Sequence, residues 1–115
     1  MTRLLVCGGR EYGATIDEQN RLFASIARLA PSIIIHGGAS GADTLAGRWA
    51  TANGVPVLIF RADWDRYGRN AGSIRNAYMI SHGQPDRVLA APGRAGTADM
   101  VRRARAAGLI VESVT

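Results

Sequence analysis

The chain alternates between two kinds of hydrophobic pattern. Short, continuous apolar runs rich in β-branched residues are typical of strands that are covered on both faces. Between them, apolar residues recur three and four positions apart, which is the spacing of an amphipathic helix. The pattern predicts strands at residues 3–7, 32–36, 55–60, 86–91 and 109–114, and helices at residues 15–30, 42–52, 73–82 and 98–107.

This order of elements predicts the fold class. Strands that alternate with helices form a parallel sheet with right-handed crossovers. We therefore expect an α/β, Rossmann-like three-layer sandwich of about five parallel strands with helices on both faces. The 115 residues suit a single domain, residues 1–115. In such folds the ligand lies beyond the carboxyl ends of the strands, where the strand order reverses.

Local signals mark the ends of several segments. Thr15 and Glu18 have the spacing of a capping box, with Thr15 as the N-cap of the first helix, and Pro31 ends that helix. Residues 61–72 are predicted to form an irregular loop rich in polar and aromatic side chains. Long ordered loops in compact domains often carry function.

Glycine-rich turns follow three of the predicted strands, at residues 8–9, 37–41 and 93–96. Glycine lets the backbone turn sharply and approach a ligand closely. A helix that starts after such a turn presents free N–H groups and favours anions such as phosphate. The turns therefore predict a composite site for a nucleotide-like ligand, although tight turns also use glycine without any ligand.

The candidate ligand-binding residues lie at or near these strand ends: Gly8, Gly9, Arg10, Gly37, Gly38, Ser40, Gly41, Asp43, Arg75, Asn76, Pro92, Gly93, Gly96 and Thr97. Arg10 and Arg75 suit bidentate contacts to phosphate, or are solvated side chains. Asp43 binds ribose hydroxyls, acts as an acid or base, or caps its helix. Trp64 and Tyr67 stack on a base as a lid, or pack their own loop.

Composition removes several classes of function. All 14 basic residues are arginine, so a Walker-type phosphate loop and a Schiff-base lysine are excluded. The net charge is +5, but the arginines are scattered, and nucleic acid is not the expected partner. With one cysteine and two histidines we expect no metal site, and no cofactor is predicted. The absence of a long apolar run or a signal peptide predicts a cytoplasmic protein with no membrane partner.

Three motifs, HGGASGAD, AGSIRN and PGRAGTADM, carry a resemblance that covers essentially the whole chain. With residues 6–10 and Trp64, their order and spacing resemble the YspA-type, YpsA-related branch of the SLOG superfamily, which is also catalogued as a domain of unknown function. The resemblance implies a Rossmann-like domain that binds nucleotides or nucleotide-derived ligands. Members are proposed as ligand sensors or nucleotide-processing enzymes, often in bacterial or phage conflict systems.

The chain is also distantly similar to the LOG phosphoribohydrolases, which release the base from a nucleoside monophosphate. Arg75 matches their arginine, and four residues match their phosphate loop: Pro92, Gly93, Gly96 and Thr97. Arg94 replaces the second glycine of that loop, and Met100 stands where their glutamate acts. Asp99 is the nearest carboxylate, and it points about a hundred degrees away around a helix. The resemblance thus implies their fold and phosphate site rather than their reaction.

Two functions follow from the sequence. The first is a binding module that senses or sequesters a nucleotide-derived small molecule at the strand ends. The alternative is a hydrolase that cleaves an N-glycosidic or phosphate bond of a nucleotide, with Asp43 or Asp99 as the catalytic acid or base. A small sheet with edge strands often pairs with a partner, so a homo-oligomer is possible.

Overall fold

The computed structural model describes residues 1–114. Its centre is one sheet of five parallel strands in the order β3-β2-β1-β4-β5. The strands are β1 (Thr2–Cys7), β2 (Pro31–His36), β3 (Val57–Ile59), β4 (Arg87–Ala90) and β5 (Ile110–Ser113). The Rossmann-like α/β fold predicted from the sequence is confirmed.

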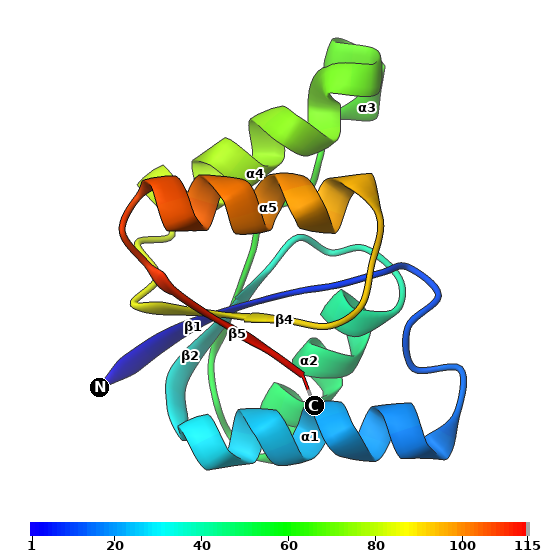
Figure 1. Ribbon diagram of the computed structural model, residues 1–115, viewed down its shortest axis with the longest axis vertical. Coiled ribbons are helices and arrows are strands. Elements are labelled where there is room, and N and C mark those ends of the chain that lie inside the picture. The colour runs from blue at the N-terminus through cyan, green and yellow to red at the C-terminus, as the bar shows by residue number, and fades with distance from the viewer. Residues whose placement is uncertain (115) are drawn as a thin grey trace.

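Helices cover both faces of this sheet (Figure 1). The helices α1 (Ile16–Leu29) and α2 (Ala42–Ala52) pack on one face, and α4 (Ala71–Ser81) and α5 (Ala95–Ala106) pack on the other. A short helix, α3 (Trp64–Tyr67), and a 3-10 turn, η1 (Gly68–Asn70), precede α4.

The central strand β1 is buried on both faces, as its apolar run predicts. Successive side chains of a strand point to opposite faces of the sheet. Leu4 and Val6 accordingly join the core beneath α1 and α2, whereas Leu5 and Cys7 join the core beneath α4 and α5. Strand β1 therefore contributes side chains to the hydrophobic core on both faces of the sheet.

The order of the strands opens a crevice beside β1. From β1 the chain moves outward to β2 and β3, then returns to place β4 on the other side of β1. The helix that follows β1 covers one face of the sheet, and the helix that follows β4 covers the other. The connections at the carboxyl ends of these two strands thus diverge, which is the topological switch point where such folds bind ligands.

The capping box at the start of α1 is confirmed. The Thr15 hydroxyl accepts a hydrogen bond from the Glu18 N–H at 3.1 Å, and the Glu18 carboxylate accepts one from the Thr15 N–H. At the other end Ala30 adopts a left-handed conformation with φ of 47°, and Pro31 begins β2. The chain therefore passes from helix to strand without a separate loop.

The prediction of an irregular loop at residues 61–72 is wrong in part, because the segment contains α3 and η1, and α4 begins at Ala71 rather than at residue 73. The carboxylate of Asp63 starts α3 by accepting a hydrogen bond from the Arg66 N–H at 3.2 Å. Hydrophobic periodicity does not detect so short a helix, because no residue of α3 is buried.

Two further boundaries differ from the prediction by more than one residue. Strand β3 covers only residues 57–59 of the predicted 55–60, and α5 begins at Ala95 rather than at residue 98. Gly96 and Thr97 therefore lie in the first turn of α5 and not in a loop before it. The Ala98 N–H donates to the Arg94 carbonyl at 3.0 Å and closes this first turn, although the glycine nearby disfavours a helix.

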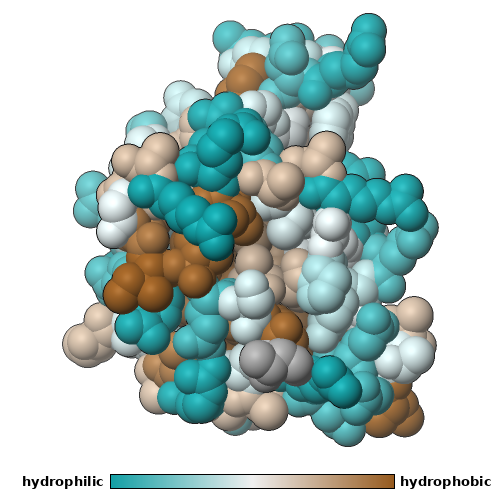
Figure 2. All heavy atoms as spheres, viewed as in Figure 1, coloured by the Kyte–Doolittle hydropathy of each residue, from teal (hydrophilic) through white to brown (hydrophobic). Residues whose placement is uncertain are grey.

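Strand β5 forms one edge of the sheet, because it pairs only with β4. The side chain of Ile110 at its start is 60% exposed, and brown, hydrophobic side chains gather on the left of Figure 2, where α5 leads into β5.

Among the described residues 1–114, no helix combines the length and the apolar character that crossing a membrane requires.

His36 ends β2 and holds the turn that follows it. Its Nδ1 accepts a hydrogen bond from the Gly38 N–H at 2.9 Å, and its side chain is buried against Gly47 of α2. Burial lowers the pKa of His36 to about 4, and the positive charges of Arg61 and Arg75 lower it further. The imidazole is therefore neutral at neutral pH and serves as a hydrogen-bond acceptor for the turn.

This geometry predicts a specific pH dependence of stability. The unfolded state binds a proton at His36 near pH 6.5, whereas the folded state binds it only near pH 4, so the free energy of unfolding falls as the pH is lowered through this window. In His36→Asn the amide oxygen accepts the same hydrogen bond without titrating, so its stability falls less over that range. Urea denaturation of both proteins between pH 7 and pH 4 tests this, and parallel profiles would contradict it.

Candidate functional site

A large cavity opens at the carboxyl edge of the sheet. Its volume is about 1160 Å³, compared with roughly 300–1,000 Å³ for typical small-molecule pockets. The end of β1, the turns after β1, β2 and β4, and the first residues of α4 and α5 line it. The cavity therefore lies at the switch point of the fold and has room for a ligand of nucleotide size.

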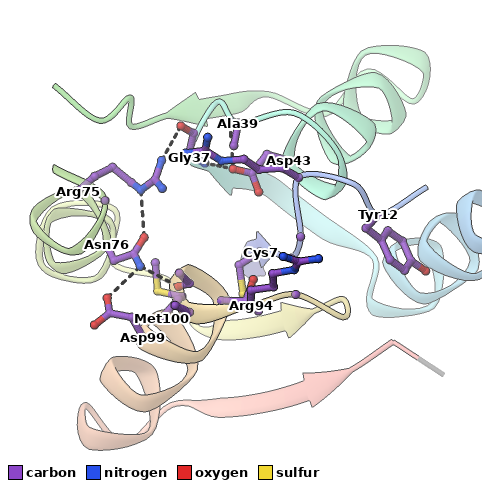
Figure 3. Close-up of a pocket in the computed structure, with 18 of the residues that line it drawn as sticks. Cys7, Tyr12, Gly37, Ala39, Asp43, Arg75, Asn76, Arg94, Asp99 and Met100 are labelled. Carbon is purple, nitrogen blue, oxygen red and sulfur yellow. Dashed lines mark hydrogen bonds between the residues drawn. The ribbon is translucent and has the colours of Figure 1, made fainter. Parts of the chain in front are cut away.

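The floor of the cavity is apolar. Val6 and Cys7 contribute from β1, Met79 from α4 and Met100 from α5. Burial raises the pKa of the Cys7 thiol to about 12, and the negative charge of Asp43 raises it further. Cys7 is thus a protonated thiol in the core and not a nucleophile. In Figure 3, Cys7 and Met100 lie below Arg75 and Asp43.

The three glycine turns bind one another at the rim. The Gly9 N–H donates to the Pro92 carbonyl at 2.9 Å, and the Ala42 N–H donates to the Gly9 carbonyl at 3.2 Å. Gly41 has φ of 76°, and a Cβ atom there would lie only 2.2 Å from the Gly9 carbonyl oxygen. The glycines therefore let the turns approach each other, which the sequence alone did not indicate.

Asp43 is buried at the start of α2, but it does not cap that helix. Its Oδ2 accepts hydrogen bonds from the N–H groups of Gly37, at 3.1 Å, and Ala39, at 3.2 Å, in the turn before the helix. Burial raises the pKa of Asp43, while these hydrogen bonds and the charge of Arg75 partly offset that effect. The carboxyl group thus shapes the turn after β2 and also lines the cavity.

Arg75 reaches across from α4 to the same turn (Figure 3). Its Nη1 donates to the Gly37 carbonyl at 2.7 Å, and its Nε donates to the Asn76 side-chain oxygen at 3.0 Å. A Cβ atom at Gly37 would lie 2.2 Å from Nη1, so any other residue there would displace the guanidinium from this position. Burial lowers the pKa of Arg75, and the like charge of Arg10 lowers it further. The negative charge of Asp43 offsets only part of this decrease.

Asn76 connects Arg75 to the start of α5. While its oxygen accepts from Arg75, its Nδ2 donates to the Gly96 carbonyl at 3.1 Å and to Asp99 Oδ2 at 3.0 Å. The side chain is buried, and these contacts use its donors and its acceptor. Asn76, a predicted ligand-binding residue, lines the cavity, and its amide contacts Arg75, Gly96 and Asp99.

Asp99 is likewise engaged by protein groups. Besides Asn76, it accepts from Arg102 at 2.5 Å and from Arg103 at 2.9 Å. Partial burial raises the pKa of Asp99, but the hydrogen bonds from Asn76 and Arg103 outweigh this effect and lower the pKa overall. A carboxylate held ionised in this way is a poor general acid.

Aromatic and cationic side chains meet at the rim. The Arg10 guanidinium lies over the Trp64 ring, 5.4 Å from its centroid, and both residues line the cavity. Tyr67 lies outside the cavity lining, where Arg66 stacks on its ring at 5.1 Å. Trp64 is therefore available at the site, whereas Tyr67 packs within its own segment.

The cavity has more positive than negative groups free to meet a ligand. Arg10, Arg69, Arg75 and Arg94 line it and form no ion pair with any carboxylate in residues 1–114. Four carboxylates line the cavity as well: Glu11, Glu18, Asp43 and Asp99. Asp99 is paired with Arg102 and Arg103, and Asp43 is buried and accepts two backbone hydrogen bonds. The arginines without an ion pair are the groups that can contact an anion.

Most residues predicted for the site come together, and four do not. Those that line the cavity are Gly8, Gly9, Arg10, Gly37, Asp43, Trp64, Arg75, Asn76, Pro92, Gly93, Gly96, Thr97 and Asp99. Those outside the lining are Gly38, Ser40, Gly41 and Tyr67. The Ser40 hydroxyl donates to the Arg10 carbonyl at 3.2 Å instead.

Arg69, Arg94 and Arg102 also line the cavity, although sequence reasoning did not select them. Each is exposed, so hydrophobic periodicity carries no signal for it. The one available signal was the spacing of Arg102, three residues after Asp99, with which it pairs. In residues 1–114 there is no group of three side chains suited to hold a metal ion.

Comparison with known proteins agrees with this arrangement. The profile of the family described as "YspA, cpYpsA-related SLOG family" (YAcAr) matches residues 2–67, which include β1, β2 and the turns that follow them. The "Gene 61 protein" of Mycobacterium phage D29 is 38% identical over 126 residues, an alignment that covers 96% of this chain and 94% of the relative. The fold, the turns at the carboxyl edge and these matches together show that the chain belongs to the YspA, cpYpsA-related SLOG family.

Proposed function

We propose that this protein binds a nucleotide-derived small molecule in the cavity at the carboxyl edge of the sheet. The observation that carries the proposal is the set of arginines around this cavity that have no carboxylate partner within residues 1–114. Unpaired guanidinium groups in a pocket favour a ligand that carries phosphate or carboxylate. Membership in a SLOG family supports a nucleotide-related role.

The phosphate is proposed to lie between Arg75 and the start of α5. No side chain caps α5, and the N–H groups of residues 95–97 precede the first intrahelical hydrogen bond, made by Ala98. Such free N–H groups favour an anion. Arg75 uses Nη1 and Nε for protein contacts, and its Nη2 has no acceptor among residues 1–114. Nη2 is therefore the group that we assign to the phosphate.

The nucleoside is proposed to lie toward Asp43 and Trp64. The two backbone hydrogen bonds to Asp43 both use Oδ2, so Oδ1 is left for a ribose hydroxyl. Trp64 is 48% exposed, and its ring already accepts a planar group, the Arg10 guanidinium, on one face. A flat base suits the same kind of surface.

Replacement of Arg75 tests the proposal. Loss of one charge-assisted hydrogen bond costs about 1.5–3 kcal/mol, so Arg75→Gln is expected to weaken AMP binding roughly 10- to 100-fold by isothermal titration calorimetry. Arg48→Gln is the matched control, because Arg48 is exposed on α2 and lies outside the cavity. Equal affinities in Arg75→Gln and the unmodified protein, with thermal unfolding showing both folded, would contradict the proposal.

The second candidate function is that of a hydrolase, and it is favoured by the position and the pKa of Asp43. Its carboxyl lines the cavity with a pKa raised by burial, as a general acid requires, whereas Asp99 is held ionised by Asn76, Arg102 and Arg103. Asp43 is therefore the residue through which cleavage of an N-glycosidic or phosphate bond would proceed.

Incubation with AMP, NAD or ADP-ribose, followed by mass spectrometry, separates the two functions. A binding module retains the nucleotide unchanged, and this is the expected result. In Asp43→Asn the amide oxygen still accepts the hydrogen bonds from Gly37 and Ala39, so the turn is preserved. Product formed by the unmodified protein and lost in Asp43→Asn would show turnover and replace the binding proposal with the hydrolase.

A further inference from the structure

The guanidinium group of Arg75 is held at two of its three nitrogens. Its Nε donates to the Asn76 side-chain oxygen at 3.0 Å, and its Nη1 donates to the Gly37 carbonyl at 2.7 Å. Two contacts on different nitrogens determine how the planar group is turned. The third nitrogen, Nη2, is the one that the proposed function assigns to the phosphate. The Asn76 oxygen therefore helps to determine where Nη2 points.

The Asn76 amide supplies that oxygen in only one of its two orientations. A side-chain amide has an acceptor oxygen on one side and a donor NH2 group on the other, and a half-turn exchanges them. In the structure the NH2 group faces the Gly96 carbonyl, at 3.1 Å, and Asp99 Oδ2, at 3.0 Å. After a half-turn the NH2 group would face the donor Nε of Arg75, and the oxygen would face two acceptors. The two acceptors on α5 therefore select the orientation that contacts Arg75.

Asp99 is the stronger of these two acceptors, because an ionised carboxylate accepts hydrogen bonds more strongly than a neutral carbonyl. The carboxylate is itself held in place, since Arg102 donates to its Oδ1 and Arg103 donates to its Oδ2. Its hydrogen bonds from Asn76 and Arg103 outweigh the effect of burial and lower the pKa of Asp99. Figure 3 shows Asn76 between Arg75 and Asp99, with a chain of hydrogen bonds through all three side chains.

We propose that Asp99 is a positioning residue for Arg75 and acts on it through the amide of Asn76. Asp99 keeps the Asn76 oxygen turned toward Arg75, and this contact holds the guanidinium with Nη2 free for an anion. The inference rests on the proposed function and deepens it, because it concerns the arginine that is assigned to the phosphate.

Charge and position predict opposite effects when Asp99 is replaced. Removal of a carboxylate from the cavity lining makes the cavity more positive, which by itself strengthens the binding of an anion. Loss of the acceptor leaves the Asn76 amide free to turn and releases Arg75, which weakens the binding of an anion. If position dominates, Asp99→Ala binds AMP about three- to tenfold more weakly than the unmodified protein in isothermal titration calorimetry.

Two further variants test the route through Asn76 and Arg75. Asp99→Asn also removes the charge but keeps an oxygen that accepts from the Asn76 amide, so it is expected to restore the affinity for AMP. In the Arg75→Gln background, Asp99→Ala is expected to cause no further loss, because the residue through which Asp99 acts is absent.

Asp17→Ala is the matched control. Asp17 also pairs with an arginine four residues further along its helix, Arg21 of α1, but it is exposed and lies outside the cavity. Its replacement should leave the affinity for AMP unchanged. Thermal unfolding shows whether each variant is folded, and Asp99→Leu, which also lacks an acceptor, replaces Asp99→Ala if the alanine variant does not fold.

The outcomes separate this inference from the proposed function. Unchanged or tighter AMP binding by folded Asp99→Ala would overturn the role of Asp99 and leave nucleotide binding in place. An equal loss in Asp99→Ala and Asp99→Asn would do the same, and so would a loss that persists in full in the Arg75→Gln background. Failure of AMP to bind the folded, unmodified protein would overturn the proposed function itself.

Discussion

The site depends on the close approach of three backbone turns at the carboxyl edge of the sheet. The turn after β1 donates to the Pro92 carbonyl through Gly9, and the Gly9 carbonyl accepts from the first residue of α2. A Cβ atom at Gly41 would overlap this contact, and one at Gly8 would lie 2.7 Å from Ala42 and from Ala91. The glycines are thus required by contacts within the protein, which hold the wall of the cavity at a fixed spacing.

A connected set of hydrogen-bonded polar side chains links these turns to the helices α4 and α5. Asp43 braces the turn after β2, Arg75 binds the carbonyl of the same turn, and Asn76 links Arg75 to the start of α5. Asp99 completes the series through its contacts with Asn76 and two arginines of α5. A phosphate between Arg75 and α5 would therefore meet groups whose positions are set before it arrives, which lowers the entropic cost of binding.

The sequence predicted the helices and strands that have a strong hydrophobic pattern. It did not identify the exposed side chains that line the cavity. The apolar runs of β1 and β2 and the capping box of α1 have local signals, and all three are present in the structure. The sequence located the glycine turns. It could not show that Gly41 packs against the backbone of Gly9 and Arg10, because these residues are far apart in the sequence. Arg69 and Arg94 could not be selected, because an exposed arginine looks the same in the sequence whether it faces a cavity or bulk solvent.

The most direct test of a nucleotide site at this edge is a crystal structure of the protein grown with ADP. If the cavity is the site, the phosphates lie about 3 Å from Arg75 Nη2 and from the N–H groups that begin α5, with the nucleoside toward Asp43 and Trp64. Well-ordered ADP at another surface, with the cavity occupied only by water, would contradict the assignment of this cavity.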